Sequence, residues 1–413
     1  MNLSRYNITF FGLLIFHFVI LLLIGDGFSI SYNEAAIFFQ DSPNILTYIA
    51  KFSTTLLGQN DFALRVPFIL FYIGSSILLY LLTDDYFRNQ WDRIIALSIF
   101  MILPGVNSAA LLVNESIIVI FCTLLYLYLY KISQKEHYIL LFLFLFIDNS
   151  FAILFLALFL YSLKKKDNIL LVVSLVLFGI SMTMYGFEVG GKPRGYLLDT
   201  FGVYASIFSP LLFLYFFYSL YRVGLKFEKD MYWYIAISSL SLSLIFSLRQ
   251  KIDIEDFAPF VVIAIPIMVK LFMHSLRIRL KEFRKIHYTI ATTTLVLLVL
   301  NFALFSINKY IYLFLENPKK HFAYDFHIAK ELALKLSELG INKVSTDDKK
   351  MGLRLKFYGI EYGKDFYITS GKAEVIDKKI PITYNDKVIS TYFLVDLSTK
   401  TEPIIKIINK RDL

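Results

Sequence analysis

Cysteine is almost absent from the chain, which has one among 413 residues, Cys122. A single cysteine excludes an intramolecular disulfide and says nothing about the redox compartment. Charged residues are also scarce, at 18%, whereas 57% of the residues are hydrophobic and 17% are aromatic. Soluble domains carry more charge and fewer apolar residues. The composition therefore favours a membrane protein.

The familiar nucleotide and hydrolase motifs are missing as well. The sequence has no Walker loop, no Rossmann fingerprint, and no GxSxG or HExxH segment. Without a nucleotide site, an ATP-driven pump is disfavoured, and a donor that acts outside the cell must be carried by the membrane. His321 and His327 lack further ligands at zinc spacing. We therefore predict no cofactor and no metal.

Long apolar runs dominate what is present. About eleven runs are candidate spans, most of them near the 17–25 residues that cross a bilayer as a helix. Because they are unbroken and lack the alternation of barrel strands, we expect helices. The ranges 138–148 and 150–163 are short, and form either a hairpin around Asp148-Asn149 or one tilted span. The predicted spans are 8–25, 66–83, 94–113, 116–131, 138–148, 150–163, 168–185, 209–224, 231–248, 258–275 and 288–312.

Basic residues indicate the orientation of these spans. With the N-terminus inside and eleven spans, the inner segments hold about 16 Lys and Arg against about six in the short outer loops. This bias favours the hairpin, and it explains the net charge of +9 better than nucleic-acid binding does. The outer segments are then 26–65, 104–115, 186–208 and 249–257, together with the region from about 317.

The C-terminal region changes character, because it becomes charged and loses its long apolar runs. A helix is predicted over 327–340, where Gly340 is a typical C-cap, and a second over 349–360. The ranges 341–347, 364–370 and 390–397 read as strands. The predicted fold is thus mostly α: a polytopic helical membrane domain, 1–316, followed by a small extracytoplasmic α/β domain, 317–413.

Two acidic residues are candidates for catalysis. Glu34, in the first outer segment, could act as a general base, or it could be a solvated loop acid. Asn114-Glu115 lies between two apolar runs, where an ionisable residue is a functional candidate. The alternative is that Asn114 or Ser116 caps the following helix and Glu115 favours its N-terminus. The two interpretations of Asn114-Glu115 are compatible.

Outer basic residues run against the positive-inside trend and are candidates for phosphate binding. The alternative is that they anchor the protein to lipid headgroups. The nearby acids Asp253, Glu255 and Asp256 could hold a divalent cation or, by preference, pair with Arg249 and Lys251. The outer basic candidates are Arg65, Lys192, Arg194, Arg249 and Lys251.

Several of these segments together resemble the GT-C glycosyltransferases that use lipid-linked sugars, the protein mannosyltransferases and the aminoarabinose transferase of lipid A. Members carry an Asp-Glu pair after the first span, a proline-containing stretch, a Gly…Arg-x-Pro segment and an acid at the fourth span. The matching positions here are Asn33-Glu34, Ser42-Pro43, Gly58…Arg65-Val66-Pro67 and Glu115, and the segment 249–268 resembles a late outer loop. Asn33 departs from the family aspartate, and Asp148-Asn149 replaces its Lys-Gly.

The resemblance implies that a sugar passes from a polyprenyl-phosphate donor to a lipid, glycan or protein acceptor on the non-cytoplasmic face. Glu34 is the preferred base, and Glu115 supports or replaces it. The basic residues above neutralise the departing phosphate, and Tyr32, Asn33, Asn114 and Tyr196 line the substrate site. The expected location is a bacterial inner membrane, with the N-terminus cytoplasmic, membrane lipids as neighbours and no nucleic-acid partner.

Two other classes of protein stay open. A transporter of lipid-linked substrates would need broken helices in repeated halves, and no such internal symmetry is seen. A non-catalytic assembly protein would tolerate the loss of Asn33 and Glu34 but not disruption of the domain at 317–413. The replacement of the family aspartate by Asn33 gives weight to this second alternative.

Overall fold

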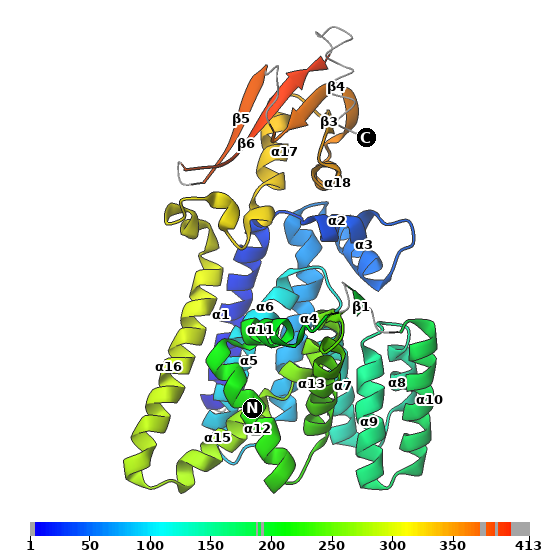
Figure 1. The fold of residues 1–413 in the computed structure, drawn as a ribbon, viewed down its shortest axis with the longest axis vertical. Helices are drawn as coiled ribbons and strands as arrows, with labels where there is room; N and C mark the ends of the chain where they lie inside the picture. Colours follow the sequence, from blue (N-terminus) through cyan, green and yellow to red (C-terminus); the bar gives the residue numbers. More distant parts are fainter. Residues whose placement is uncertain (1–4, 187–188, 191–193, 372–376, 385–386, 398–413) are drawn as a thin grey trace. The chain divides into compact units, whose positions relative to one another are not determined.

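The computed structural model describes residues 5–186, 189–190, 194–371, 377–384 and 387–397. The chain divides into two compact units, which are described separately. The first comprises Met1–Leu21 and Phe68–Phe302, and the second comprises Leu22–Pro67 and Ala303–Leu413. Three helices run from one unit into the other: α1 (Arg5–Gly27), α4 (Asp61–Leu82) and α16 (Lys281–Ser306) (Figure 1).

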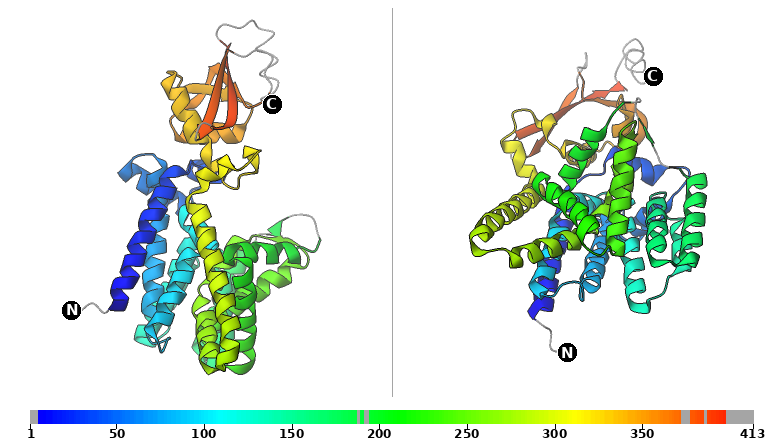
Figure 2. Two further views of the ribbon diagram at one scale, coloured as in Figure 1. Left: turned by 90° about the vertical axis from the view of Figure 1, so that its left-hand side faces the viewer. Right: turned by 60° about the horizontal axis from the view of Figure 1, so that its bottom comes forward.

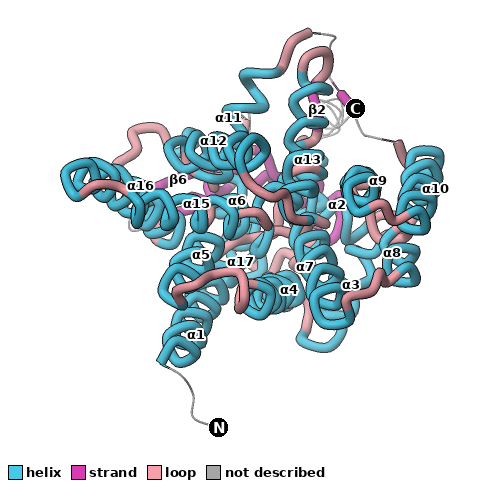
Figure 3. Tube along the Cα trace, turned by 90° about the horizontal axis from the view of Figure 1, so that it is seen from below, coloured by secondary structure: helices cyan, strands magenta, loops and turns pink. Residues whose placement is uncertain are grey.

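The first unit is helical throughout, apart from one short ribbon. Viewed along the helices, α9 lies beside α10, and α12 lies beside α15 (Figure 3). Its remaining helices are α5 (Gln90–Ile102), α6 (Pro104–Leu111), α7 (Ser116–Ser133), α8 (Tyr138–Phe144), α9 (Phe151–Lys165), α10 (Asn168–Met184), α11 (Leu197–Phe208), α12 (Pro210–Lys226), α13 (Met231–Ser247), the short η1 (Ile254–Asp256), α14 (Ala258–Val262) and α15 (Ile265–Ile278).

Polar residues at the ends of the apolar runs fix where these helices begin. The side chain of Asn89 accepts a hydrogen bond from Trp91 N at the start of α5, and Asp167 accepts from Leu170 N at the start of α10. Asp230 does the same for Trp233 N at the start of α13. Such caps satisfy backbone N–H groups that have no partner within the helix. The apolar runs of the sequence consequently coincide closely with the helices.

The number of spans differs from the prediction. Within the described residues, four helices are long and apolar enough to cross a membrane: α1, α4, α7 and α16. Three bent pairs raise the number to seven if each is one span: α5 with α6, α11 with α12, and η1–α14 with α15. This is fewer than the predicted eleven, because α8, α9, α10 and α13, which coincide with four of the predicted spans, each have fewer than 18 residues.

Prolines account for the bends. Pro104 begins α6, Pro210 begins α12, and Pro266 lies in the first turn of α15. Proline has no backbone N–H and restricts the residue before it, so a helix readily ends there and a new one begins. The bends are 55° between α5 and α6, 105° between α11 and α12, and 42° between α14 and α15.

A two-stranded ribbon joins two segments of the first unit that are predicted to lie outside. Strand β1 (Val189–Gly190) pairs antiparallel with β2 (Lys251–Ile252), with Val189 opposite Ile252 and Gly190 opposite Lys251. The ribbon therefore brings the chain that follows α10 next to the chain that follows α13.

The second unit combines residues Leu22–Pro67 with the C-terminal region. Helices α2 (Tyr32–Phe39) and α3 (Ile45–Leu57) precede α4, and α2 packs against α18. A four-stranded sheet has the order β3-β4-β6-β5, with β3 parallel to β4 and the other pairs antiparallel; its strands are orange to red in Figure 2. The C-terminal elements are η2 (Asn308–Leu313), η3 (Pro318–Lys320), η4 (Tyr324–His327), α17 (Ala329–Glu338), β3 (Lys343–Thr346), α18 (Lys349–Phe357), β4 (Glu361–Thr369), β5 (Lys378–Tyr384) and β6 (Lys387–Asp396).

The C-terminal predictions are confirmed for both helices and for the three strands β3, β4 and β6. Strand β5 was not predicted, since Pro381 interrupts a short sequence with lysines at its start. The predicted boundary between residues 316 and 317 stays a prediction. The contact-based units place residues 22–67 with the C-terminal region, because α2 and its neighbours pack there.

Candidate functional site

Arg65 forms the centre of a buried charged cluster in the second unit. It lies in the first turns of α4, and its side chain is wholly buried. Its Nη2 is 3.4 Å from Glu34 Oε2, and its Nη1 is 3.6 Å from Asp61 Oδ1. Glu34 is 2% exposed and Asp61 1%. Charges buried this deeply persist only when they are paired, so the three residues depend on one another.

Glu34 also fixes the start of α2. Ser31 Oγ accepts a hydrogen bond from Glu34 N at 3.2 Å, and Glu34 Oε2 accepts one from Ser31 N at 2.8 Å. This reciprocal arrangement is a capping box. The same carboxylate oxygen thus serves the helix cap and the ion pair with Arg65, and both interactions hold Glu34 away from solvent.

The cluster extends to α17 and α18. Tyr358 OH donates to Asp61 Oδ1 at 2.7 Å and accepts from Ile30 N at 2.9 Å. Lys330 Nζ lies 3.5 Å from Asp61 Oδ2, and Arg354 Nε donates to Ile30 O at 2.8 Å. Burial, with the charge of Asp61 second, raises the pKa of Tyr358, so its hydroxyl stays protonated. The sequence did not predict these contacts, because no local pattern connects the C-terminal residues with Ile30 or Asp61.

The neighbours of Glu34 on α2 face outward. Asn33, at the position of the family aspartate, is exposed. Tyr32 is 40% exposed, with Lys350 Nζ 5.3 Å from its ring centre. Successive helical residues point about 100° apart, so a buried Glu34 leaves Asn33 on the open side. The amide of Asn33, and not the carboxylate of Glu34, is therefore the group that this helix offers to solvent.

Glu115 occupies the loop between α6 and α7 in the first unit. Asn114 Oδ1 accepts a hydrogen bond from Ser116 N at 3.2 Å, but the N-cap residue of α7 is Glu115 and not Asn114 or Ser116. Burial raises the pKa of Glu115 to about 7, and the charges of Asp148, Glu255 and Asp253 act in the same direction. Near neutral pH this carboxyl group can therefore both take up and release a proton.

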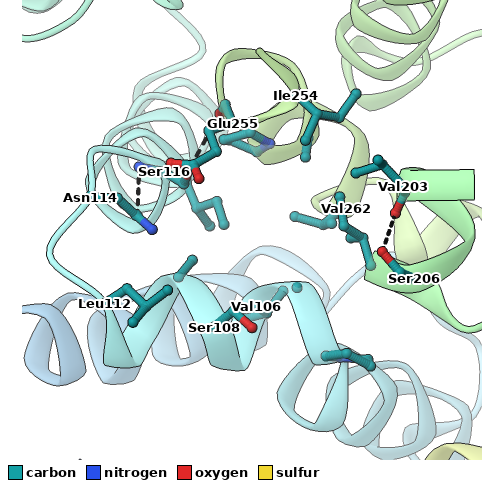
Figure 4. A pocket seen from close by; sticks show the side chains of 17 residues that line it. Val106, Ser108, Leu112, Asn114, Ser116, Val203, Ser206, Ile254, Glu255 and Val262 are labelled. Atoms are coloured by element: carbon teal, nitrogen blue, oxygen red, sulfur yellow. Dashed lines mark hydrogen bonds between the residues drawn. The ribbon is translucent and has the colours of Figure 1, made fainter. Parts of the chain in front are cut away.

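A cavity of about 320 Å³ lies beside this loop, lined by α6, α7, α11 and the η1–α14 segment. In Figure 4, Asn114, Ser116 and Glu255 lie together on one side, and Val203, Ser206 and Val262 lie on another. Ser116 Oγ donates to the backbone oxygen of Glu255 at 3.2 Å. The cavity is mostly apolar with a few convergent polar groups, which is typical of ligand sites.

The predicted basic residues of two outer loops come together in the same unit. Tyr196 is buried and its N donates to Ser247 O at 2.7 Å, which sets Arg194 beside the chain leading to Arg249. Arg194 is exposed. Its Nη2 lies 3.9 Å from Asp199 Oδ2, and its Cζ lies 4.7 Å from the ring centre of Tyr196. Arg249 and Lys251 are exposed, and neither forms an ion pair with another described residue. Lys192 lies outside the described residues.

The acids at 253–256 follow this basic segment directly. The preferred pairing of Asp253, Glu255 and Asp256 with Arg249 and Lys251 is not seen, since those two bases make no ion pair in the described part of the chain. Within the same residues, no three acidic, histidine or cysteine side chains are grouped to hold a metal ion.

Comparison with known proteins relates one part of the chain to a family. Residues 41–148 match the family model described as dolichyl-phosphate-mannose-protein mannosyltransferase. That range contains Arg65 and Glu115 but not Glu34. No curated protein sequence matches the chain.

Two solved structures are similar to the chain, both of ArnT from Cupriavidus metallidurans. The structure bound to undecaprenyl phosphate has a TM-score of 0.50, and the apo structure one of 0.49. In each comparison the two sequences are 10% identical, and the matched region covers 94% of this chain and 97% of the ArnT chain.

The chain is thus a multi-pass helical membrane protein with a small C-terminal sheet and the fold seen in ArnT. The resemblance to GT-C glycosyltransferases that use lipid-linked sugars is confirmed, in sequence over residues 41–148 and in fold over 94% of the chain.

Proposed function

We propose that this protein transfers a sugar from a polyprenyl-phosphate donor to an acceptor hydroxyl or phosphate on the non-cytoplasmic face of the inner membrane. The family match at residues 41–148 and the fold shared with a protein crystallised with undecaprenyl phosphate support this class of reaction. The observation that carries the proposal is Glu115, a carboxyl group with a pKa near 7 whose chain neighbours Asn114 and Ser116 line a mostly apolar cavity.

Glu115 is the general base in this proposal. For a hydroxyl acceptor, its carboxylate takes the proton as the acceptor oxygen bonds to the anomeric carbon of the donor. The bond between that carbon and the phosphate oxygen breaks in the same step, so polyprenyl phosphate leaves and the configuration inverts. A base with a pKa close to the working pH is well matched to this task.

The cations of the outer loops receive the leaving group. Negative charge grows on the lipid phosphate as its bond to the sugar breaks, and a nearby cation lowers the energy of that transition state. Arg249 and Lys251 are suited to this role because they are exposed and make no ion pair among the described residues. Arg194 and Lys192 are the further candidates, and Asn114 and Tyr196 contribute to the substrate site.

Glu34 and Arg65 take a positioning role. Both are buried and paired with each other, and Glu34 also caps α2, so neither is presented to a substrate. Their interactions support the geometry of the outer segment that carries Tyr32 and Asn33. This assignment favours Glu115 over Glu34, the base preferred from the sequence.

Release of polyprenyl phosphate from a panel of polyprenyl-phosphate sugars tests the proposal on the purified full chain in nanodiscs. We expect wild type to release it and Glu115→Gln to be roughly 10²–10⁴-fold slower, the usual contribution of a general base. Glu228→Gln, which changes an exposed acid between α12 and α13, is the matched control. A wild-type rate for Glu115→Gln would exclude Glu115 as the base.

One observation favours a second function. Asn33 stands exposed where the family has an acid, and an amide cannot accept the proton of an acceptor. A protein that binds lipid-linked sugars and assembles with partners, without catalysis, would show this pattern. Saturable binding of donors with no release from any of them would support that function instead.

A further inference from the structure

A small polar cavity lies in the second unit and shares only Lys330 with the charged cluster described above. It encloses about 100 Å³ beside the end of α1 and the start of α17. The lining residues that matter are Asp26, Lys309, His327, Lys330, Glu331 and Tyr384. At about 30 Å³ for one water molecule, the cavity has room for a group of a few heavy atoms and not for a sugar or a lipid tail.

His327 lines this cavity and has an unsatisfied ring nitrogen. The residue is 1% exposed, and its Nδ1 lies 3.0 Å from Tyr312 OH. Its Nε2 has no hydrogen-bond partner in the described part of the chain. Burial lowers the pKa of His327 to about 3, helped by His321 and Lys309, so the ring is neutral. A buried nitrogen rarely lacks a partner, and this one points to a bound group.

Lys309 is the available cation of the cavity. Its Nζ lies 5.0 Å from the ring centre of Tyr384, and it forms no ion pair among the described residues. Lys330, by contrast, is already paired with Asp26 at 3.3 Å and with Asp61 at 3.5 Å. Burial lowers the pKa of Lys309, whereas Glu331 and Asp26 favour its charged form. An anion would therefore find one unpaired positive charge here.

We propose that this cavity binds a small oxyanion, a carboxylate or phosphate group, between Lys309 Nζ and the Nε2–H of His327. The anion selects the tautomer in which Tyr312 OH donates to Nδ1 and the proton is on Nε2. Glu331 also lines the cavity, so an anion of low charge is favoured over a strongly charged one. The oxyanion belongs either to a free solute or to a lipid headgroup.

Thermal unfolding of the full chain in neutral detergent tests the site, with inorganic phosphate or acetate as the probe and chloride at equal ionic strength as the reference. Binding to the folded state raises the midpoint in a saturable way and yields a dissociation constant. We expect at least one of the two probes to raise the midpoint of wild type where chloride does not. No saturable rise with either would exclude the free solute.

Two variants locate the effect. Lys309→Met removes the charge and keeps most of the unbranched side chain, and His327→Phe keeps a ring against Tyr384. Each is expected to weaken binding of the probe at least roughly tenfold, as the loss of a hydrogen bond to a charged group does. The matched control is Lys320→Met, which changes an exposed lysine on η3. If His327→Phe fails to fold, Lys309→Met decides, and binding unchanged in it overturns the proposal.

Lipid nanodiscs separate the two sources of the oxyanion. The unfolding midpoint is compared for wild type and Lys309→Met in discs with and without phosphatidic acid. A rise that depends on both the lipid and Lys309 identifies a headgroup as the ligand. If only free phosphate or acetate acts through Lys309, the ligand is a solute, and if neither does, the proposal is wrong. None of these measurements depends on glycosyl transfer.

Discussion

Two acidic residues of similar sequence context have opposite surroundings. Glu34 is buried against an arginine and caps its own helix. Burial, reinforced by the nearby acids Asp148, Glu255 and Asp253, raises the pKa of Glu115 to about 7. A paired carboxylate holds structure together, whereas a carboxyl group whose pKa is raised by burial, with neighbouring acids adding to the effect, exchanges a proton near neutral pH. The difference arises from the partners that folding provides, and the residue types alone do not reveal it.

The pH profile should report Glu115 directly. A general base acts only when deprotonated, so with a pKa of about 7 we expect kcat/KM to fall as the pH is lowered through 7, about tenfold per unit below it. With an ordinary value near 4.5 the same fall would come at much lower pH. Rates measured from pH 5 to 9 check this, and in Glu115→Gln the residual rate should lose this step. If the Glu115→Gln variant kept the fall in kcat/KM near pH 7, that fall would have to come from the titration of another group.

Arg65 is expected to be essential for stability. Arg65→Met leaves Glu34 and Asp61 buried without their cation, which costs about 3–5 kcal/mol. The unfolding midpoint in detergent should fall accordingly, whereas Arg88→Met, at an exposed position, should change stability by less than about 0.5 kcal/mol. The double variant Glu34→Gln, Arg65→Met should lose less than the sum of the single variants, because the residues share one interaction. Fully additive losses would contradict the pairing.

At the level of helices and strands, the sequence predicted positions better than associations. Apolar runs, caps and prolines are local signals, so the predicted spans coincide with α1, α4, α7 and α16 and with most of the shorter helices. The helices α2 and α3 were not expected within the segment 26–65. Helix α2 packs against both α3 and α18, and no local pattern encodes these contacts.

The contact between α6 and α11 limits the cavity beside Glu115. A Cβ on Gly105 would lie 2.4 Å from Ile207 Cγ2, and both residues line that cavity. Gly105→Ala should therefore push the two helices apart and cost about 1–3 kcal/mol, with a loss of donor affinity. Gly202→Ala, on α11 with open space around it, should be neutral or stabilising by up to about 1 kcal/mol. Equal unfolding midpoints for the two variants would show that the contact is not tight.

For the whole molecule, the orientation in the membrane stays a prediction that one labelling experiment can decide. Cys122 is buried, so a new exposed cysteine can be detected over it. In cells whose outer membrane is permeabilised and whose inner membrane is intact, a membrane-impermeant maleimide should label Lys320→Cys and not Lys135→Cys. We place residue 320 outside the inner membrane and residue 135 inside. Both lysines are exposed in the structure. Labelling of the reverse pair would invert the topology and move Glu115 to the cytoplasmic face.

The long-range contacts were beyond sequence reasoning for a physical reason. Arg354 and Ile30 are 324 residues apart, and Tyr358 and Asp61 are 297 apart. Neither partner carries a periodicity or motif that names the other, whereas Glu34, Glu115 and the outer arginines stand out as charges at the ends of apolar runs. The candidate residues were therefore predictable from the sequence, but the surroundings that distinguish their roles were not.

The same separation has a consequence for biosynthesis. The outer segment around Ile30 is among the first parts of the chain to be made, and the arginine and tyrosine that fasten it are made near the end. At about 5–20 residues per second, the ribosome needs roughly 15–60 s to travel between them. During that interval Glu34 and Asp61 can already pair with Arg65, but Asp61 lacks Tyr358 and Lys330, and Ile30 lacks Arg354. A truncated or stalled product would therefore insert its helices and yet leave this segment unassembled, so that only a completed chain acquires the fold.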